Sequence, residues 1–169
     1  KCISYGKFIG LYRFSSVSSY KNAFNESPSS INISLLTGHS MLRVQVMNGE
    51  INRCATKDEI NKMQNILENA LIDGSIGLST GLAYPAANDA PTEEIIELAK
   101  VLKKHDGIFT THMRNEGDNL VESVNETIKI GKLADVRTVI SHHKCAGRSN
   151  WGKSKETLKL IKEAKKTQH

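Results

Sequence analysis

Histidines follow two of the apolar runs in this sequence, at the point where each run ends. The stretch GIFTT precedes His112, and the stretch VIS precedes His142, His143 and Lys144. A single histidine in such a place is usually the solvent-exposed end of a strand, but two such histidines could share a metal ion. Zinc binds neutral imidazole at about 2.0–2.1 Å, and catalytic zinc sites combine three protein ligands with an open position for water. Zinc would lower the pKa of that water to about 7 and polarise a carbonyl group. The spacing therefore indicates a candidate zinc site, although acid–base catalysis or phosphate binding would use the same residues.

The elements that must position these histidines are short strands separated by helices. We predict strands over 31–36, 76–79, 108–111 and 136–141. Parallel neighbours need a crossover connection, so this alternation is typical of βα units and a parallel sheet. The carboxyl ends of parallel strands lie on one edge of an open sheet or one face of a barrel, where ligands bind. We therefore expect His112 and His142 to lie side by side at one end of the sheet.

The helices between the predicted strands have recognisable start and stop signals. Thr56 and Glu59 form a capping box, and Gly74 supplies the stop after the apolar face that follows them. Further helices are predicted from Thr92 to near Gly107, over about 118–133, and in the Lys-rich C-terminal stretch. These signals support the alternation of strands and helices from about residue 31 onward.

Composition fits one globular domain. The chain has 169 residues, which is long enough to bury a core. Its 38% apolar and 24% charged residues are typical of a globular protein. We treat 1–169 as a single unit in which 1–30 are a poorly defined lead-in, with a helix in SVSSYKNAF, and 31–169 hold the βα repeats. The sequence begins with Lys1, so we expect its natural start to lie upstream.

Charge and cysteine content bear on partners and location. The formal net charge is +5, and much of the excess lies in KSKETLKLIKEAKKTQ, where lysines alternate with apolar residues as on the solvated face of a helix. The stretch lacks the interleaved aromatic residues of a nucleic-acid site, so we predict no nucleic-acid partner. Apolar runs fall short of the roughly 20 residues that span a bilayer, so we predict no membrane partner. Cys2, Cys54 and Cys145 form no C-x-x-C pair, which favours a reduced, cytoplasmic protein.

Four motifs resemble those of a known family. They are GHSMLR (38–43), GSIGLSTGLAYP (74–85), THMRNEG (111–117) and SHHKCAGRSNWG (141–152). From about Tyr12 to the C-terminus, their order and spacing resemble the N-acyl-D-amino-acid deacylases, or D-aminoacylases, of the amidohydrolase superfamily. Members are (β/α)₈ barrels with a small appended β-domain, and they hydrolyse N-acyl-D-amino acids at a zinc site. The resemblance implies an α/β fragment: a partial TIM barrel of about four parallel βα units, the third to sixth strands, with the β-domain absent.

The resemblance also implies a metal site and a substrate site. His112 and His142 match the zinc histidines that follow the fifth and sixth strands. Tyr84 and Lys144 match positions expected to hold the substrate, and a lysine suits its free carboxylate. His143 is the poorer ligand of its pair, because adjacent strand residues point to opposite faces; it is a candidate for a group beside the site.

Other polar residues of the motifs are given supporting roles. Arg114 and Glu116 are candidates for groups that orient the metal ligands, although they could equally be a solvent-exposed loop pair. His39 matches no metal ligand of the family, so we expect it to make a structural hydrogen bond. Trp151 is expected to anchor the loop after the last strand, and Cys54 and Cys145 are expected to take no part.

The sequence also departs from the family pattern. The His-containing metal motif of the first strand and the general-base aspartate of the eighth have no match, so no catalytic residue is assigned in this chain. Cys2 lacks the glycines expected around the family's cysteine ligand and lies too close to the next matched segment. We therefore predict a fragment of a zinc-dependent hydrolase of linear amides, acting on small N-acyl-D-amino acids, inactive by itself, whose exposed barrel edges would invite self-association. The alternative is a truncated, non-catalytic α/β module with a structural or binding role.

Overall fold

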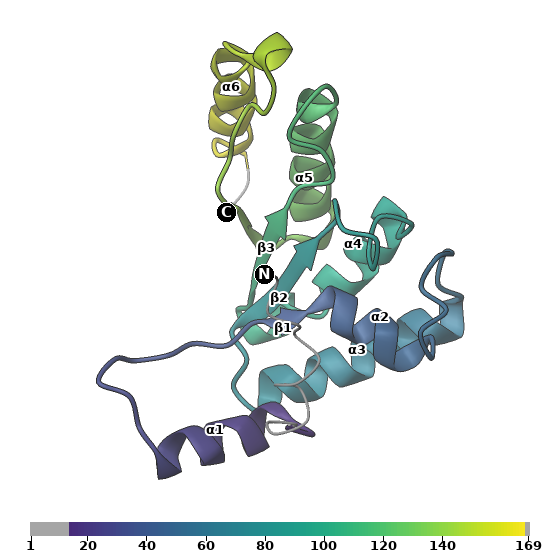
Figure 1. Ribbon diagram of the computed structural model, residues 1–169, viewed down its shortest axis with the longest axis vertical. Coiled ribbons are helices and arrows are strands. Elements are labelled where there is room, and N and C mark those ends of the chain that lie inside the picture. Colours follow the sequence, from purple (N-terminus) through teal and green to yellow (C-terminus); the bar gives the residue numbers. More distant parts are fainter. Residues whose placement is uncertain (1–13, 168–169) are drawn as a thin grey trace, which may run out of the picture.

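The computed structural model describes residues 14–167, so Cys2 and Tyr12 lie outside the described part of the chain (Figure 1). The elements are, in order, α1 (Val17–Glu26), β1 (Thr37–Gly38), α2 (His39–Val46), α3 (Lys57–Ile72), β2 (Gly77–Gly81), α4 (Thr92–Lys100), the 3₁₀ turn η2 (Lys103–His105), β3 (Ile108–His112), α5 (Leu120–Ala134), β4 (Arg137–Ile140), the 3₁₀ turn η3 (Arg148–Asn150) and α6 (Ser154–Ala164). Helices separate consecutive strands from β1 onward, as the sequence predicted, with the one addition of α2 between β1 and α3.

The strands form one parallel sheet in the order β1-β2-β3-β4. All three neighbouring pairs are parallel, and the register places Gly81 beside His112 and Thr111 beside Ile140. The predicted parallel α/β arrangement, with strands adjacent in chain order, is confirmed. The register also aligns the carboxyl ends of β2, β3 and β4 at one edge of the sheet.

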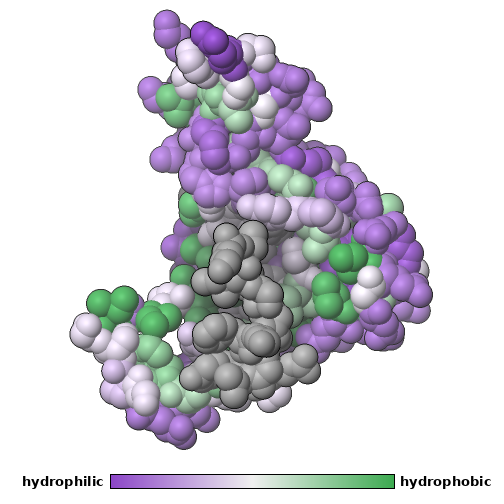
Figure 2. Space-filling view, viewed as in Figure 1, coloured by the Kyte–Doolittle hydropathy of each residue, from purple (hydrophilic) through white to green (hydrophobic). Residues whose placement is uncertain are grey.

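The prediction of a strand over 31–36 is wrong. The first strand is only Thr37–Gly38, although the Leu35 carbonyl already accepts a hydrogen bond of 2.8 Å from the Ile76 amide. The apolar side chains of the predicted strand do not enter the core, because Ile31 is 69% exposed and Ile33 is 45% exposed. Figure 2 shows apolar side chains gathered on the surface of the long connection that precedes β1 in Figure 1. Ile31, Ile33 and Leu35 instead line a surface pocket together with Tyr20 and Phe24 of α1.

Helix boundaries follow the local signals closely. Thr56 accepts a hydrogen bond from the Glu59 amide, and the Glu59 carboxylate accepts one from the Thr56 amide, so the predicted capping box starts α3. Gly74, with φ of +104°, follows the end of α3 in a conformation that favours glycine. The helix predicted from Thr92 to near Gly107 is shorter than expected, because α4 stops at Lys100 and a 3₁₀ turn follows. The helix α2, which begins within GHSMLR and ends at Val46, was not predicted.

The core lies between the sheet and the row of helices. Consecutive helices contact one another from α2 to α6, and Figure 1 shows them following one another along the sheet. Leu78 of β2 and Phe109 of β3 are fully buried with residues of α3 and α4 such as Met63 and Leu98. Because side chains of a strand alternate between faces, His112 of β3 points to the opposite face from Phe109 and away from this core. Among residues 14–167, no helix combines the length and apolar character needed to cross a membrane.

Candidate active site

The two histidines that follow β3 and β4 face each other. His112 is the last residue of β3, and His142 follows β4 by two residues with φ of +38°, an uncommon conformation for a non-glycine residue. Nδ1 of His112 lies 3.0 Å from Nε2 of His142, and the ring centroids are 4.7 Å apart. The structure therefore brings together the two side chains that the sequence predicted as neighbours.

Glu116 lies against both histidines. Its Oε1 is 3.2 Å from Nδ1 of His142, and its Oε2 is 3.7 Å from Nε2 of His112. One potential ligand atom from each of the three side chains falls within a cluster no wider than 4.8 Å. The Glu116 side chain is only 11% exposed, so its carboxylate is held in place rather than free in solvent. The sequence analysis predicted that Glu116 lies beside the site but not that it contacts both rings. The only sequence feature that pointed to this contact is that His112 and Glu116 belong to one motif.

Lys144 completes this polar cluster. Its Nζ lies 2.6 Å and 2.5 Å from the two carboxylate oxygens of Glu116 and 3.0 Å from Nδ1 of His142. Burial by itself raises the pKa of Glu116, but the hydrogen bond from Lys144 and the electrostatic influence of Lys144 and the two neighbouring histidines outweigh it. The pKa of Glu116 therefore lies below its ordinary value, so the group is a carboxylate at neutral pH. Lys144 already binds a carboxylate in this structure.

Tyr84 lies over His112, at the same end of the sheet. The two ring centroids are 5.0 Å apart, with the planes tilted by 34°. Gly81, the last residue of β2, makes this position available, because a Cβ on Gly81 would lie 2.6 Å from Cδ2 of Tyr84. Tyr84 and Lys144 thus lie beside the histidine pair, as the resemblance implied for residues that hold a substrate.

An open cleft of about 790 Å³ extends from His112 between the loops that follow β3 and β4. His112 and Glu116 line one part of it, and Gly147 and Asn150 line another. This volume is within the range of sites for small organic ligands, roughly 300–1,000 Å³. The cleft has room for a small substrate next to the candidate metal ligands.

Two of the predicted site residues are directed elsewhere. His143 places Nε2 3.0 Å from Oγ1 of Thr157, so its ring faces α6. Arg114 donates hydrogen bonds to the Glu126 carboxylate on α5 and to the Asn88 carbonyl in the loop after β2. Neither residue is placed by these contacts to orient a metal ligand directly. His143 faces α6 and not His112, as predicted, although it follows a turn after β4 and is not part of a strand.

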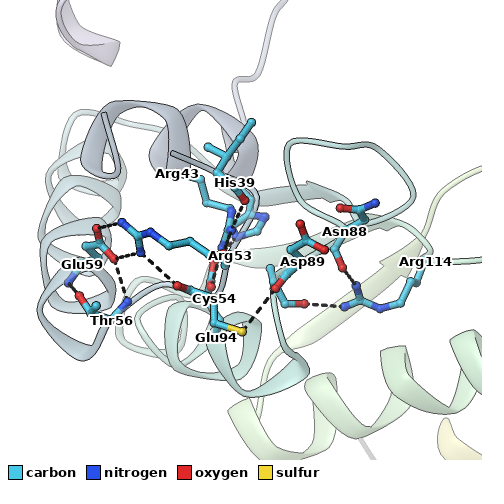
Figure 3. A network of polar contacts seen from close by, with 12 residues as sticks. His39, Arg43, Arg53, Cys54, Thr56, Glu59, Asn88, Asp89, Glu94 and Arg114 are labelled. Carbon is cyan, nitrogen blue, oxygen red and sulfur yellow. Dashed lines mark hydrogen bonds and ion pairs between the residues drawn. The ribbon is translucent and has the colours of Figure 1, made fainter. Parts of the chain in front are cut away.

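His39 belongs to a separate, fully buried network, shown in Figure 3. Its Nε2 lies 2.8 Å from Oε1 of Glu94, while Arg43 donates to both oxygens of the same carboxylate at 2.7 and 2.6 Å. Burial raises the pKa of Glu94, but the hydrogen bonds from His39 and Arg43 outweigh it, so the pKa is lowered. Arg43 also donates to the carbonyls of Ile51 and Arg53. His39 makes the predicted structural hydrogen bond, whereas the buried role of Arg43 was missed.

The remaining candidates lie outside the cluster. Trp151 is 69% exposed, and the guanidinium carbon of Arg148 lies 5.7 Å from the centroid of its ring, so this contact stays within the loop that Trp151 was expected to anchor. The thiol of Cys54 donates a long hydrogen bond to the Asp89 carbonyl, and Cys145 is a free thiol.

Comparison with known proteins gives relatives for nearly the whole chain. No protein-family model matches it. The chain is 46% identical over 155 residues to a D-aminoacylase and 43% identical over 159 residues to an N-acyl-D-aspartate deacylase, both from Alcaligenes xylosoxydans xylosoxydans. These matches cover 92% and 94% of this chain and 32% of each relative. The chain thus spans about a third of the length of the curated relatives it matches.

Solved structures agree with the sequence relationship. A crystal structure of D-aminoacylase, described as defining a subset of amidohydrolases, matches with a TM-score of 0.89 and 47% identity over 92% of this chain and 33% of that chain. An N-acyl-D-glutamate deacylase from Bordetella bronchiseptica, complexed with zinc and a phosphonate inhibitor, matches with a TM-score of 0.88 and 37% identity over 91% of this chain and 32% of that chain. The four parallel βα units therefore have the fold of a segment of an amidohydrolase of the TIM-barrel type. The chain is homologous to a segment of the N-acyl-D-amino-acid deacylase family, as its four sequence motifs predicted.

Proposed function

We propose that this chain supplies one side of the active site of a zinc-dependent amidohydrolase, which hydrolyses an N-acyl-D-amino acid to a D-amino acid and a carboxylate. The observation that carries the proposal is the contact between His112 and His142, with Lys144 beside them at the same strand ends. The relatives that share these motifs include a D-aminoacylase and an N-acyl-D-aspartate deacylase.

The histidine pair fits a zinc ion. Nδ1 of His112 and Nε2 of His142 are 3.0 Å apart, close to the roughly 3.3 Å that separates two nitrogens bound tetrahedrally to zinc at about 2.0–2.1 Å. Imidazole is also among the ligands that zinc prefers. When bound, zinc would supply a Lewis acid for the amide carbonyl and a water molecule of lowered pKa. The zinc complex of the Bordetella relative supports zinc as the metal.

Glu116 is placed to orient both imidazole rings. Each ring turns one nitrogen toward the other ring and its second nitrogen toward the Glu116 carboxylate, at 3.2 Å for His142 and 3.7 Å for His112. A carboxylate that accepts the second N–H fixes the tautomer and leaves the first nitrogen free to bind a metal. For His142 this tautomer requires the Lys144 ammonium, 3.0 Å from the same Nδ1, to donate to Glu116 and not to the ring. We therefore assign Glu116 to holding His142, and more loosely His112, in the metal-binding tautomer.

Lys144 and Tyr84 are assigned to the substrate. The ammonium group of Lys144 is half-exposed and already binds a carboxylate, so it can bind the free carboxylate of an N-acyl-amino acid by the same charge-assisted hydrogen bonds. Tyr84 covers His112 and is exposed toward solvent, where it can contact the acyl or side-chain portion of a substrate. Arg114 and His143 act on neighbouring elements and are given no direct contact with the reaction.

The proposal leaves proton transfer to a residue that this sequence does not match. We infer that the 169-residue chain binds zinc without appreciable turnover, since the general base implied by the resemblance has no counterpart in it. The competing proposal is a non-catalytic α/β module. It is supported by the position of β4, which is an edge strand with exposed side chains, because an open edge can pair with another chain. A cytoplasmic location is supported by the free thiols of Cys54 and Cys145.

A segment exchange tests the proposed function. The matching segment of the Alcaligenes D-aminoacylase is replaced by this chain, and the product is assayed with N-acetyl-D- and N-acetyl-L-amino acids in the presence of zinc. We expect turnover with preference for the D enantiomer, and loss of turnover in the same protein carrying His142→Ala. A folded, zinc-containing exchange protein without turnover would favour the binding module instead.

A further inference from the structure

The loop between β2 and α4 lies against His112 although it has little regular structure. We call residues 82–91, which include Tyr84, the Tyr84 loop. Its first amide, that of Leu82, donates to the His112 carbonyl at 3.1 Å, and the Tyr84 carbonyl accepts hydrogen bonds of 2.9 Å from the amides of Ala87 and Asn88. The start of the loop is therefore tied to β3 at the residue that we assign to the metal.

The far half of the same loop is held by Arg114, two residues after His112. Its Nη1 donates to the Asn88 carbonyl at 2.7 Å, and its Nη2 donates to the Ala90 carbonyl at 2.9 Å. Figure 3 shows the Arg114 side chain directed at the backbone of this loop. Both halves of the Tyr84 loop are thus attached to the short segment that contains His112 and Arg114.

Glu126 on α5 fixes the guanidinium group in this orientation. Its carboxylate accepts hydrogen bonds from Nε of Arg114 at 3.0 Å and from Nη2 at 2.9 Å. It also accepts one of 2.8 Å from Oγ1 of Thr92, the first residue of α4. Only a planar guanidinium has enough donors in a fixed fork to bind one carboxylate and two carbonyls together. Charge-assisted hydrogen bonds of this kind, partly shielded from water, are stronger than neutral ones.

We propose that Arg114 and Glu126 are positioning residues, which hold the Tyr84 loop so that the Tyr84 ring lies over His112. The ring separation of 5.0 Å and the space that Gly81 leaves beside Tyr84 show how closely the loop must be placed. Arg114 acts through the loop and not on the substrate, so its removal should move Tyr84 relative to His112 while β3 stays in the sheet. The consequence for hydrolysis rests on the proposed function, but the geometry of the loop does not.

The test uses the 169-residue chain with its histidines isotopically labelled. The ring current of Tyr84 shifts the NMR signal of the His112 imidazole, and Tyr84→Leu gives the position of that signal without the ring. We expect Arg114→Lys and Glu126→Gln each to move the signal toward the Tyr84→Leu position. We also expect hydrogen exchange at the Ala87 and Asn88 amides to be about tenfold faster, because local opening of the loop is made easier.

Arg137→Lys is the matched control. Arg137 also binds a carbonyl and a carboxylate, both of Asp106, but it lies at the first residue of β4, at the opposite end of the sheet. Its substitution should leave the His112 signal and the loop amides unchanged. Two variants are used because they break the same contact from opposite sides, and one can be read if the other fails to fold.

Two results would overturn the proposal. One is a His112 signal and loop amides that match the unchanged chain in both variants. The other is faster exchange spread equally over all protected amides, which would mean that Arg114 only stabilises the fold. Neither measurement needs metal or substrate. If the segment exchange is inactive but Arg114→Lys and Glu126→Gln still shift the His112 signal, the proposed function is refuted and the role of Arg114 and Glu126 is not. In an active segment exchange, Arg114→Lys should raise KM more than it lowers kcat.

Discussion

Nε2 of His142 lies 3.0 Å from Nδ1 of His112, which leaves each ring with its second nitrogen turned toward Glu116. The contact joins the ends of β3 and β4, two neighbouring parallel strands. Two imidazoles this close, without a carboxylate between the facing nitrogens, can hydrogen-bond to each other or share a metal ion. The relationship therefore predicts metal binding that depends on particular ring nitrogens and on what holds them.

Removing one ligand should weaken zinc binding, whereas removing its neighbour should not. We expect His142→Ala to lower the zinc affinity of the 169-residue chain by more than about 100-fold, because one nitrogen ligand is lost. His143→Ala is the control, since His143 faces Thr157 on α6 and not His112. Competition against a chromogenic chelator measures both affinities. Equal losses in the two variants would show that zinc binds somewhere other than the His112–His142 pair.

Glu116 should affect zinc binding without being required for folding. We expect Glu116→Gln to lower zinc affinity roughly 10- to 100-fold, the usual effect of removing a carboxylate that orients a metal-binding histidine. The amide keeps the size of the side chain and loses the charge that Lys144 and His142 contact. The measurement is the same zinc titration, accompanied by a thermal unfolding curve without metal. A loss as large as that in His142→Ala would instead make Glu116 a ligand.

The buried Glu94 should contribute far more to stability than an exposed glutamate on the same helix. Glu94→Gln leaves the guanidinium of Arg43 buried without its counter-charge, and breaking such a buried pair costs about 3–5 kcal/mol of unfolding free energy. Glu97, one turn later on α4, pairs with Lys100 in solvent, so Glu97→Gln should cost about 0.5 kcal/mol or less. Urea unfolding compares the two. Equal costs would mean that water enters the His39–Arg43–Glu94 network.

Stability should fall as the pH is lowered below about 5. The hydrogen bonds from Arg53 lower the pKa of Glu59 to about 2, and the pKa of Glu94 is also lowered, whereas an unfolded glutamate titrates near pH 4.3. Because the folded pKa values lie below the unfolded ones, this stabilisation is complete above the unfolded pKa and is lost as the pH falls through the folded pKa. Unfolding curves from pH 7 to pH 2 should show the decline. Glu59→Gln keeps the capping box and should make the fall of unfolding free energy with pH less steep. An unchanged pH dependence in this variant would contradict the role of Glu59.

The sequence predicted what depends on local pattern and topology, and missed what depends on distant partners. Strand order and the His112–His142 contact follow from alternating elements and from the alignment of parallel strand ends, so both could be predicted. The capping box of Thr56 was equally local. Arg43 was missed because its partner Glu94 is 51 positions away and lies on another helix, and an arginine is rarely buried unless it is paired. The strand prediction for 31–36 failed because an apolar composition does not by itself decide burial: Ile31, Ile33 and Leu36 are exposed.

Lys144 should determine how tightly a substrate carboxylate binds. In the segment exchange with the Alcaligenes D-aminoacylase, we expect Lys144→Met to raise KM for N-acetyl-D-amino acids roughly 10- to 100-fold, the cost of a charge-assisted hydrogen bond. Lys129→Met is the control, because Lys129 pairs with Glu93 on the helical side of the sheet. Steady-state kinetics with a substrate amide that lacks the carboxylate completes the test, since that compound should be insensitive to Lys144. A fall in kcat with KM unchanged would place Lys144 at the transition state and not at the carboxylate.

The isolated 169-residue chain should bind zinc weakly and hydrolyse N-acyl-D-amino acids negligibly. His112 and His142 supply two nitrogen ligands, whereas catalytic zinc sites use three protein ligands, and the general base that contributes about 10²–10⁴-fold has no match in this sequence. Assays of the chain and of the segment exchange with N-acetyl-D- and N-acetyl-L-amino acids, with and without zinc, give the comparison. The segment exchange should turn over the D enantiomer and the isolated chain neither. Robust turnover by the isolated chain would require a base among its own residues, and Glu116, the carboxylate nearest to both histidines, would then be the first to substitute.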